Sequence, residues 1–190
     1  MVNAQSVEEP VTLKPGDQGA DWSGLKSTDD KVISLSELSN FDVVIMCFTC
    51  NTCPYSVDYE DRLKALQEKI ESEKLSAVLV AINSNAVRGD ALEAMKRRAE
   101  EKGFRFAYVK DESQVVARAY GAIYTPEFYV LDKRRRIVYR GAMDDQTDAA
   151  LVTKNYVELA VAAAMKGDFP ADREIPARGC TIRYQRRRRP

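Results

Sequence analysis

The sequence predicts an α/β protein in which helices flank a central mixed β-sheet. Three observations support this fold class: continuous apolar, β-branched runs, amphipathic segments between them, and a hairpin pattern followed by one further apolar helix. Continuous apolar runs are typical of strands buried on both faces, whereas apolar side chains at helical spacing are typical of helices packed on one face. Helices and buried strands alternate first, as in a βαβ unit, and a ββα unit then completes one sheet.

The N-terminal part precedes the first buried strand. Residues 1–12 are expected to form a flexible lead. Two short apolar segments then flank Ser27-Thr28-Asp29-Asp30, whose side chains can hydrogen-bond to nearby backbone groups. This pattern predicts an N-terminal β-hairpin.

Apolar spacing predicts the remaining strands and helices. The expected strands are residues 41–48, 75–83, 104–111, 127–132 and 136–141. The expected helices are residues 54 to about 71, 89–103, 112–121 and roughly 148–166. Gly103 and Gly121 suit the ends of two of these helices, and Pro54 suits the first turn of another.

Composition argues against several classes of partner. Lys plus Arg and Asp plus Glu are equal at 29 each, so no overall basic field would attract nucleic acid. The run Arg186-Arg187-Arg188-Arg189 is expected to be a solvated tail. No apolar run is long enough to span a bilayer, so no membrane partner is expected. The chain lacks histidine, which removes the usual general base.

The compartment stays open at this point. The first ten residues lack the basic and apolar regions of a signal peptide, but Ala4-Gln5 sits where a small-residue cleavage site could lie. A cytoplasmic location fits the sequence, and so does an exported or periplasmic one from which a signal peptide has been removed.

Three cysteines at intervals of three residues occupy the stretch IMCFTCNTCPYS. Cys47 lies within an expected buried strand, where an unpaired cysteine behaves as a small hydrophobic side chain, so we expect it to pack in the core. Cys50 falls at the turn from strand to helix, and Cys53 stands directly before Pro54. A thiol at a helix N-terminus faces unpaired backbone N–H groups that favour the thiolate. This Cys-x-x-Cys pair therefore predicts thiol–disulfide chemistry.

The chain resembles the thioredoxin superfamily, and within it the redoxin branch of AhpC/TSA, peroxiredoxin-like proteins. The segments that carry the resemblance are LKPGD, FTCNTCPYSVDYEDRL, INSN, DESQVVARAYGAIYTPEFYVLD, VYRGAMDD and GCTIRY. They are collinear over most of the chain, and the first cysteine motif is similar to the F-T-C-N-x-C-P-Y site of a bacterial peroxiredoxin-like subgroup. The resemblance implies a thioredoxin-like domain over residues 13–167, followed by a C-terminal extension with a basic tail over residues 168–190.

A thioredoxin-type site also implies a proline, usually cis, at the start of the strand that faces the cysteine pair. Thr125-Pro126 supplies it, directly before an expected strand. A cis bond leaves the backbone of the preceding residue free to pair with an incoming peptide. The resemblance therefore implies that Tyr124, Thr125 and Pro126 bind substrate.

Three positions depart from better-known relatives. Peroxiredoxins carry a Pro-x-x-x-Thr-x-x-Cys site, in which a threonine stands three residues before the catalytic cysteine. In this chain the residue three before Cys53 is Cys50, and the residue three before Cys50 is Cys47, so neither cysteine has that threonine. Val44 stands where thioredoxins bury an acid, and Thr52 stands where strongly oxidising relatives have histidine. We therefore expect the pKa of Cys50 to be less depressed than in those relatives. The helix N-terminus and neighbouring polar groups would be the main stabilisation of its thiolate.

Cys180, in the segment ARGCTIRYQ, has two interpretations. The surrounding tyrosine, arginine and isoleucine suggest a short extended segment that docks on the domain, which would make the cysteine structural. The recurrence of GCTIRY in the resemblance instead suggests a third redox partner that reaches Cys50 or Cys47.

The residues beside the motifs also have two interpretations each. Tyr55, Tyr124 and Phe128 are expected to pack in the core or at the rim of the site, although the two tyrosines could line a substrate groove. Glu127 directly follows the proline and either tunes the site electrostatically or is an exposed acid at a strand edge.

The leading hypothesis is a thiol–disulfide oxidoreductase in which Cys50 attacks a substrate disulfide and Cys53 resolves the mixed disulfide. It needs a protein or small-molecule disulfide and a thiol reductant, needs no cofactor, and fits a monomer or a homodimer. One alternative is a peroxiredoxin-like thiol peroxidase that acts through a sulfenic acid on either cysteine. A second alternative is a module that binds Zn or Cu(I) through Cys47, Cys50 and Cys53. Cysteines in a strand interior and at a helix start do not easily point their three sulfurs at one metal ion, which argues against this alternative.

Overall fold

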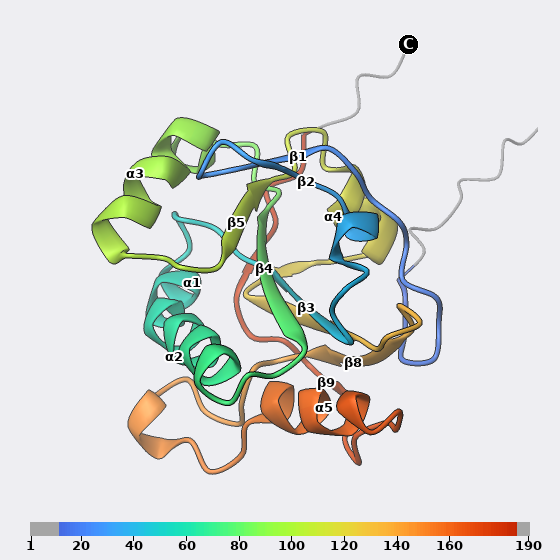
Figure 1. The fold of residues 1–190 in the computed structure, drawn as a ribbon. Coiled ribbons are helices and arrows are strands. Elements are labelled where there is room, and N and C mark those ends of the chain that lie inside the picture. Colours follow the sequence, from blue (N-terminus) through green and yellow to red (C-terminus); the bar gives the residue numbers. More distant parts are fainter. Residues whose placement is uncertain (1–11, 186–190) are drawn as a thin grey trace, which may run out of the picture.

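An eight-stranded mixed sheet forms the centre of the molecule (Figure 1); the structure is a computed structural model that describes residues 12–185. In spatial order the strands are β2 (Val32–Ile33), β1 (Leu25–Ser27), β5 (Ala107–Lys110), β4 (Ala77–Asn83), β3 (Val43–Phe48), β7 (Glu127–Leu131), β8 (Ile137–Gly141) and β9 (Glu174–Ile175). β3, β4 and β5 run parallel, and β7 and β8 continue the sheet in antiparallel pairs. This mixed sheet with flanking helices confirms the predicted fold class.

Helices cover both faces of the sheet (Figure 1). The α-helices are α1 (Pro54–Asp58), α2 (Glu60–Ser72), α3 (Leu92–Lys102), α4 (Val115–Tyr120) and α5 (Tyr156–Met165). Short 3-10 helices are η1 (Leu35–Leu38), η2 (Arg88–Asp90) and η3 (Ala149–Leu151). The predicted N-terminal hairpin is present, because β1 and β2 pair antiparallel across the Ser27–Asp30 turn.

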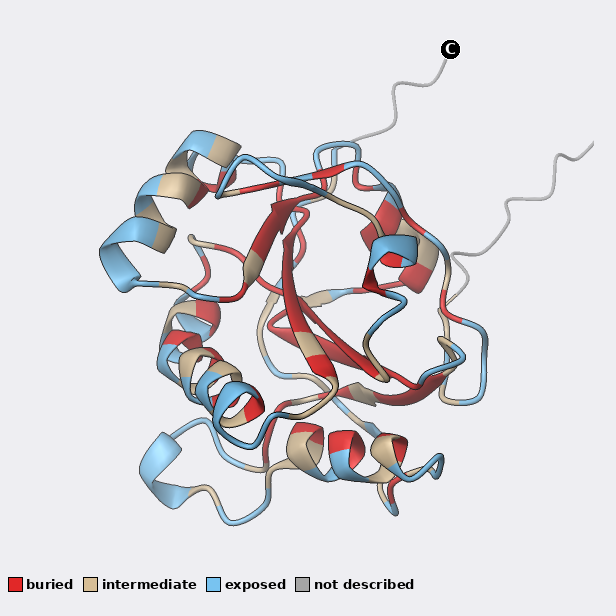
Figure 2. Cartoon of the chain, in the orientation of Figure 1, coloured by how far each residue is buried: buried red, intermediate tan, exposed pale blue. Residues whose placement is uncertain are grey.

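The central strand β3 divides the core into two halves because its side chains alternate between the two faces of the sheet. Val43, Ile45 and Cys47 face a cluster completed by α2 and α5, whereas Val44 and Met46 face a cluster completed by α4 and the N-terminal segments. Every residue of β3 is buried, and Figure 2 shows the central strands almost entirely in the colour of buried residues. Burial on both faces explains why this strand is a continuous apolar run.

All four predicted helices differ in their bounds from the structure: the helix expected over 89–103 is divided into η2 and α3 by the extended residue Ala91, the one expected over 112–121 is only α4, and the other two differ more. The helix expected from residue 54 to 71 is interrupted at Tyr59, whose N–H bonds to the carbonyl of Ser56 and so tightens the turn between α1 and α2. The helix expected over 148–166 begins only at Tyr156, because the side chain of Asn155 caps it by accepting the N–H of Glu158. The residues before that cap form η3 and an extended segment instead.

The C-terminal part of the described chain adds two further strands. β9 pairs parallel with β8 at the edge of the main sheet, and β10 (Cys180–Thr181) pairs antiparallel with β6 (Tyr124–Thr125) in a separate two-stranded ladder. The run Arg186–Arg189 and nearly all of the expected N-terminal lead lie outside the described residues. Within residues 12–185, none of the helices combines the length and the apolar character needed to cross a bilayer.

Gly141 should be intolerant of substitution because β9 passes directly over it. Its φ is +132°, and an added Cβ would lie 1.7 Å from the carbonyl oxygen of Ile175. We expect Gly141→Ala to lower the free energy of unfolding by about 2–4 kcal/mol, measured by urea denaturation. Gly167 also has a positive φ, of +78°, but faces open space, so Gly167→Ala is the matched control. Equal losses in the two variants would contradict this explanation.

Candidate active site

The cysteine pair lies where the central strand β3 gives way to the first helix. Cys50 stands two residues after the end of β3, and Cys53 is the N-cap residue of α1, with Pro54 in the first helical position. The carbonyl of Cys53 accepts the N–H of Val57 and closes the first turn. Both thiols are nearly inaccessible, since Cys50 is 3% exposed and Cys53 is 2% exposed.

Thr125 brings the two thiols together from the opposite side of the site. The Sγ atom of Cys53 donates to the carbonyl oxygen of Thr125 at 3.1 Å, and the Sγ atom of Cys50 lies 3.5 Å from its Oγ1. The bond between Thr125 and Pro126 is cis, as the sequence predicts. The structure therefore places the Thr-Pro motif directly against the cysteine pair.

Cys180 joins the same cluster through β10. The backbone of Cys180 is opposite Thr125 in the β10–β6 ladder, and its carbonyl accepts the Thr125 hydroxyl at 3.4 Å. The thiols of Cys180 and Cys53 are close enough to shift each other's pKa. The predicted docking of this segment on the domain is confirmed, whereas the redox interpretation of Cys180 stays a prediction. The thiol whose ionisation is most strongly linked to that of Cys180 is Cys53.

A buried carboxylate, Asp90 on η2, holds the loop between the two cysteines. It accepts hydrogen bonds from the backbone N–H of Asn51 at 2.7 Å and from the hydroxyl of Thr52 at 2.6 Å. The side-chain amides of Asn83 and Asn85 donate to the same carboxylate, each at 3.1 Å. Asp90 is fully buried, so these four donors replace the water that an ionised carboxylate would otherwise need.

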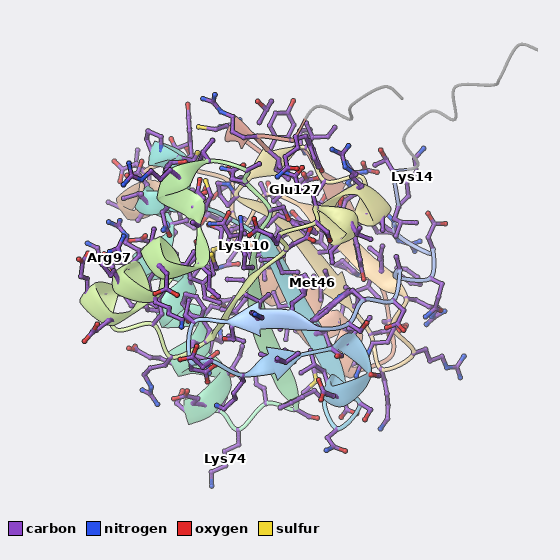
Figure 3. The ribbon with its side chains drawn as sticks, turned by 90° about the horizontal axis from the view of Figure 1, so that it is seen from above. Lys14, Met46, Lys74, Arg97, Lys110 and Glu127 are labelled. Atoms are coloured by element: carbon purple, nitrogen blue, oxygen red, sulfur yellow. The ribbon has the colours of Figure 1, made fainter. Side chains whose placement is uncertain are left out.

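A second buried carboxylate, Glu127, fixes the loop on the other side of the site. Its Oε2 atom accepts the backbone N–H groups of Ile123 and Tyr124, and its Oε1 atom lies 3.4 Å from the guanidinium of Arg140. Glu127 is 2% exposed and lies within the body of the molecule in Figure 3, whereas Lys74 extends outward. The interpretation of Glu127 as an exposed strand-edge acid is therefore wrong.

The aromatic residues beside the motifs divide between core and rim. Phe128 is completely buried and pairs with Cys47 across β7 and β3. Tyr55 is largely exposed, and Tyr124 is partly buried in β6. Tyr108, which we did not expect near the site, donates its hydroxyl to the side-chain oxygen of Asn51 at 2.9 Å.

The environments of the thiols shift their pKa values in different directions. Burial raises the pKa of Cys50, with the negative charge of Asp90 adding to it, although hydrogen bonds from Thr125 and the turn backbone oppose the shift. Burial also raises the pKa of Cys53, but the neighbouring Cys180, the Ser56 backbone and the Thr125 hydroxyl outweigh it and leave that pKa lowered. Cys53 is therefore the thiol of the pair that ionises more readily.

The other two thiols are held in the protonated form. The neighbouring side chain of Cys53, followed by burial, raises the pKa of Cys180 to about 11. Complete burial raises the pKa of Cys47 well above its ordinary value, and Cys47 sits in the core as expected. In the part of the chain that the structure describes, no three Cys, Asp or Glu side chains are grouped so that they could hold a metal ion. Cys47, Cys50 and Cys53 therefore do not form the ligand set of the metal-binding alternative.

Sequence reasoning missed Asp90, Asn83 and Asn85, which shape the loop between the cysteines. One usable signal existed, because a polar Asn-Ser-Asn follows directly after the apolar run that forms β4. β3 and β4 are parallel neighbours, so the residues after their carboxyl ends meet at one edge of the sheet.

The mixed sheet with helices on both faces defines a thioredoxin-like fold. The sequence profile of the AhpC/TSA family matches residues 15–140, and the chain belongs to that family. A search among curated proteins finds no matching sequence.

Several solved structures share this fold. An uncharacterized conserved protein from Geobacillus kaustophilus is 32% identical, with a TM-score of 0.83 over 92% of this chain and 94% of that one. A hypothetical protein from Sinorhizobium meliloti 1021 is 30% identical, with a TM-score of 0.82 over 92% and 97% of the two chains. The peroxidoxin BcpB from Mycobacterium tuberculosis shares the fold at 19% identity, with a TM-score of 0.62 over 82% and 97%.

Removing the charge of Asp90 should destabilise the loop that carries the cysteines. We expect Asp90→Asn to lower the free energy of unfolding by about 2–4 kcal/mol, because the new amide group would face donors rather than acceptors. Urea denaturation measures this loss. Asp58→Asn, at an exposed position, is the control and should change the value by less than about 0.5 kcal/mol. A loss no larger than that of the control would show that the four hydrogen bonds are unimportant.

The two thiols of the pair should titrate in a definite order. Because the thiolate is the reactive form, a lowered pKa moves the onset of alkylation to lower pH and a raised pKa moves it to higher pH. We expect Cys53 to reach half-maximal iodoacetamide alkylation at a lower pH than Cys50. Labelling the native protein across a pH series and locating the label by peptide fragmentation measures both midpoints. The reverse order would contradict the electrostatic account of the site.

Proposed function

We propose that this protein is a thiol–disulfide oxidoreductase whose redox pair is Cys50 and Cys53. The observation that carries the proposal is the convergence of both thiols on Thr125, with Cys53 3.1 Å from its carbonyl oxygen and Cys50 3.5 Å from its hydroxyl. The two cysteines stand three residues apart across a tight turn, which is the separation that thiol–disulfide exchange between neighbours requires. Membership of the AhpC/TSA family supports the same chemistry.

The exchange proceeds in two balanced steps. The thiolate of Cys53 attacks one sulfur of a substrate disulfide, which forms a mixed disulfide and releases the first substrate thiolate. The thiol of Cys50 then loses its proton and attacks the Cys53 sulfur, which releases the second substrate thiolate. The substrate disulfide is thereby reduced to two thiols, and the protein is oxidised to a Cys50–Cys53 disulfide that a thiol reductant restores.

The roles in this scheme are the reverse of those that the sequence suggests. The sequence assigns the first attack to Cys50, since that residue falls at the turn from strand to helix. The lowered pKa of Cys53 and its place at the N-cap of α1 favour Cys53 as the attacking thiolate. The raised pKa of Cys50 makes it better suited to the second step, where proximity compensates for a small thiolate fraction.

Serine variants of the two cysteines test the proposal. We expect Cys53→Ser and Cys50→Ser each to reduce turnover in a dithiol-dependent insulin reduction assay by about 100-fold or more, because each removes one step of the exchange. In Cys50→Ser/Cys180→Ser, which lacks both thiols that could resolve it, a mixed disulfide between Cys53 and the substrate should be trapped. Cys47→Ala is the matched control, because Cys47 lies in the core and should affect stability rather than turnover.

Two results would overturn the proposal. Full insulin reduction by both serine variants would exclude the cysteine pair as the redox centre. Rapid, stoichiometric consumption of hydrogen peroxide by the reduced protein, without insulin reduction, would instead assign the site to a thiol peroxidase that forms a sulfenic acid.

A further inference from the structure

The C-terminal strap, residues 174–185, crosses the candidate site and is anchored on both sides of it. Before the site, β9 pairs with Arg140 and Gly141 of β8. In Figure 1 this red segment runs from β9 behind the sheet toward the opposite side of the molecule. The residues between the two anchors lie over the cysteine pair, because Cys180 is paired with Thr125.

The anchor after the site is the more extensive one. Ile182 is buried in the core, and its N–H bonds to the carbonyl of Ile123 at 2.8 Å. The hydroxyl of Tyr184 donates to the carbonyl of Ala122 at 2.7 Å, and the guanidinium of Arg118 lies 4.4 Å from the centre of its ring. These contacts fix the position of Cys180 rather than leaving it on a free tail.

The strap occupies the backbone edge that the resemblance assigns to substrate. Cys180 and Thr181 pair antiparallel with Thr125 and Tyr124, in the position of an incoming peptide. Gly179 makes the close approach possible, since an added Cβ would lie 2.1 Å from the carbonyl oxygen of Thr125. A cysteine of the chain itself is therefore held where a substrate cysteine would be held.

Cys180 is more accessible to solvent than the two cysteines of the pair. Cys50 and Cys53 are 3% and 2% exposed, so direct exchange between either sulfur and an external disulfide or thiol requires the strap to shift first. Cys180 is only partly buried and is the most accessible of the four thiols. Its backbone pairs with Thr125, whose carbonyl accepts the thiol of Cys53, so Cys180 lies between solvent and the buried pair.

We propose that Cys180 is a third redox cysteine that forms a disulfide with Cys53 and transfers oxidising equivalents between the buried Cys50–Cys53 pair and external thiols or disulfides. This inference rests on the proposed function of that pair, and it gives the strap the role of an internal substrate.

The transfer is balanced at each step. The thiolate of Cys180 attacks Cys53 in the Cys50–Cys53 disulfide, forming a Cys53–Cys180 disulfide and releasing Cys50 as a thiol after it takes up a proton. An external thiolate then attacks the accessible sulfur of Cys180 and releases Cys53. A second external thiolate attacks the external sulfur of this mixed disulfide and releases Cys180 as a thiolate, which leaves the external pair oxidised to a disulfide and the protein reduced. The reverse sequence reduces an external disulfide.

Peptide mapping tests whether the disulfide forms. Trypsin places Cys47, Cys50 and Cys53 together on residues 32–62 and Cys180 alone on residues 179–183, so a Cys53–Cys180 disulfide joins two separate peptides. After oxidation of the reduced protein with one equivalent of diamide, non-reducing mass spectrometry should detect this joined pair. It should persist in Cys47→Ser/Cys50→Ser and disappear in Cys53→Ser.

Turnover tests whether the disulfide serves the exchange. We expect Cys180→Ser to reduce insulin turnover by about 10-fold or more, because the remaining sulfurs are nearly buried. Thermal denaturation of Cys180→Ser confirms that the variant is folded. If the joined peptide does not form, the proposal is overturned, whatever turnover Cys180→Ser shows. If Cys180→Ser reduces insulin at the wild-type rate, the proposal is overturned even when the joined peptide forms. In either case loss of turnover in Cys53→Ser still supports the proposed function.

A second variant keeps all four thiols and moves the strap. Gly179→Ala introduces a clash with the backbone of Thr125, so the joined peptide should form about 10-fold more slowly than in the wild type. Thr181→Ala is the matched control, because its exposed side chain can be removed without disturbing the β10–β6 pairing. Joining at the wild-type rate in Gly179→Ala would contradict delivery of Cys180 by the strap.

Discussion

The site depends on the position of one residue, Thr125, because all three of its thiols are placed by it. Its carbonyl accepts the thiol of Cys53, its hydroxyl contacts the thiol of Cys50, and its strand β6 pairs with Cys180. Thr125 in turn is held by its neighbour Glu127, which fixes the two preceding backbone N–H groups. A small movement of this loop would therefore separate the thiols from one another, whereas the sheet behind them could remain unchanged.

Two buried carboxylates assemble the site from opposite sides. Asp90 holds the loop between the cysteines through four hydrogen bonds, and Glu127 holds the proline loop through backbone N–H groups and Arg140. Burying such charges is costly unless each is satisfied by donors, so both loops are ordered by the same requirement. The charge of Asp90 also acts on Cys50 and adds to the rise in its pKa. The group that orders the loop thereby helps to make the two cysteines chemically different.

The fold was largely predictable from the sequence, but the site was predictable only in part. β3 and β4 are continuous apolar runs because both of their faces are buried, and the Cys-x-x-Cys and Thr-Pro motifs mark the two loops that meet. The start of α5 was missed because Asn155 and its local hydrogen bond override a helix-favouring composition. Asp90 and Cys180 act through partners distant in the chain, as shown by Thr125 and Cys180 at 55 residues apart, which no local pattern reveals.

Cys53 occupies the middle position among three thiols, and this order has a chemical consequence. Its sulfur can form one disulfide at a time, so a bond to Cys50 excludes a bond to Cys180. Under the proposed transfer, each disulfide leaves the third thiol free, and that thiol is the one placed to attack Cys53 next. The equilibrium can therefore pass from one bond to the other without any external molecule entering the core. The strap can stay docked through this step, and only the partly exposed sulfur of Cys180 has to meet solvent.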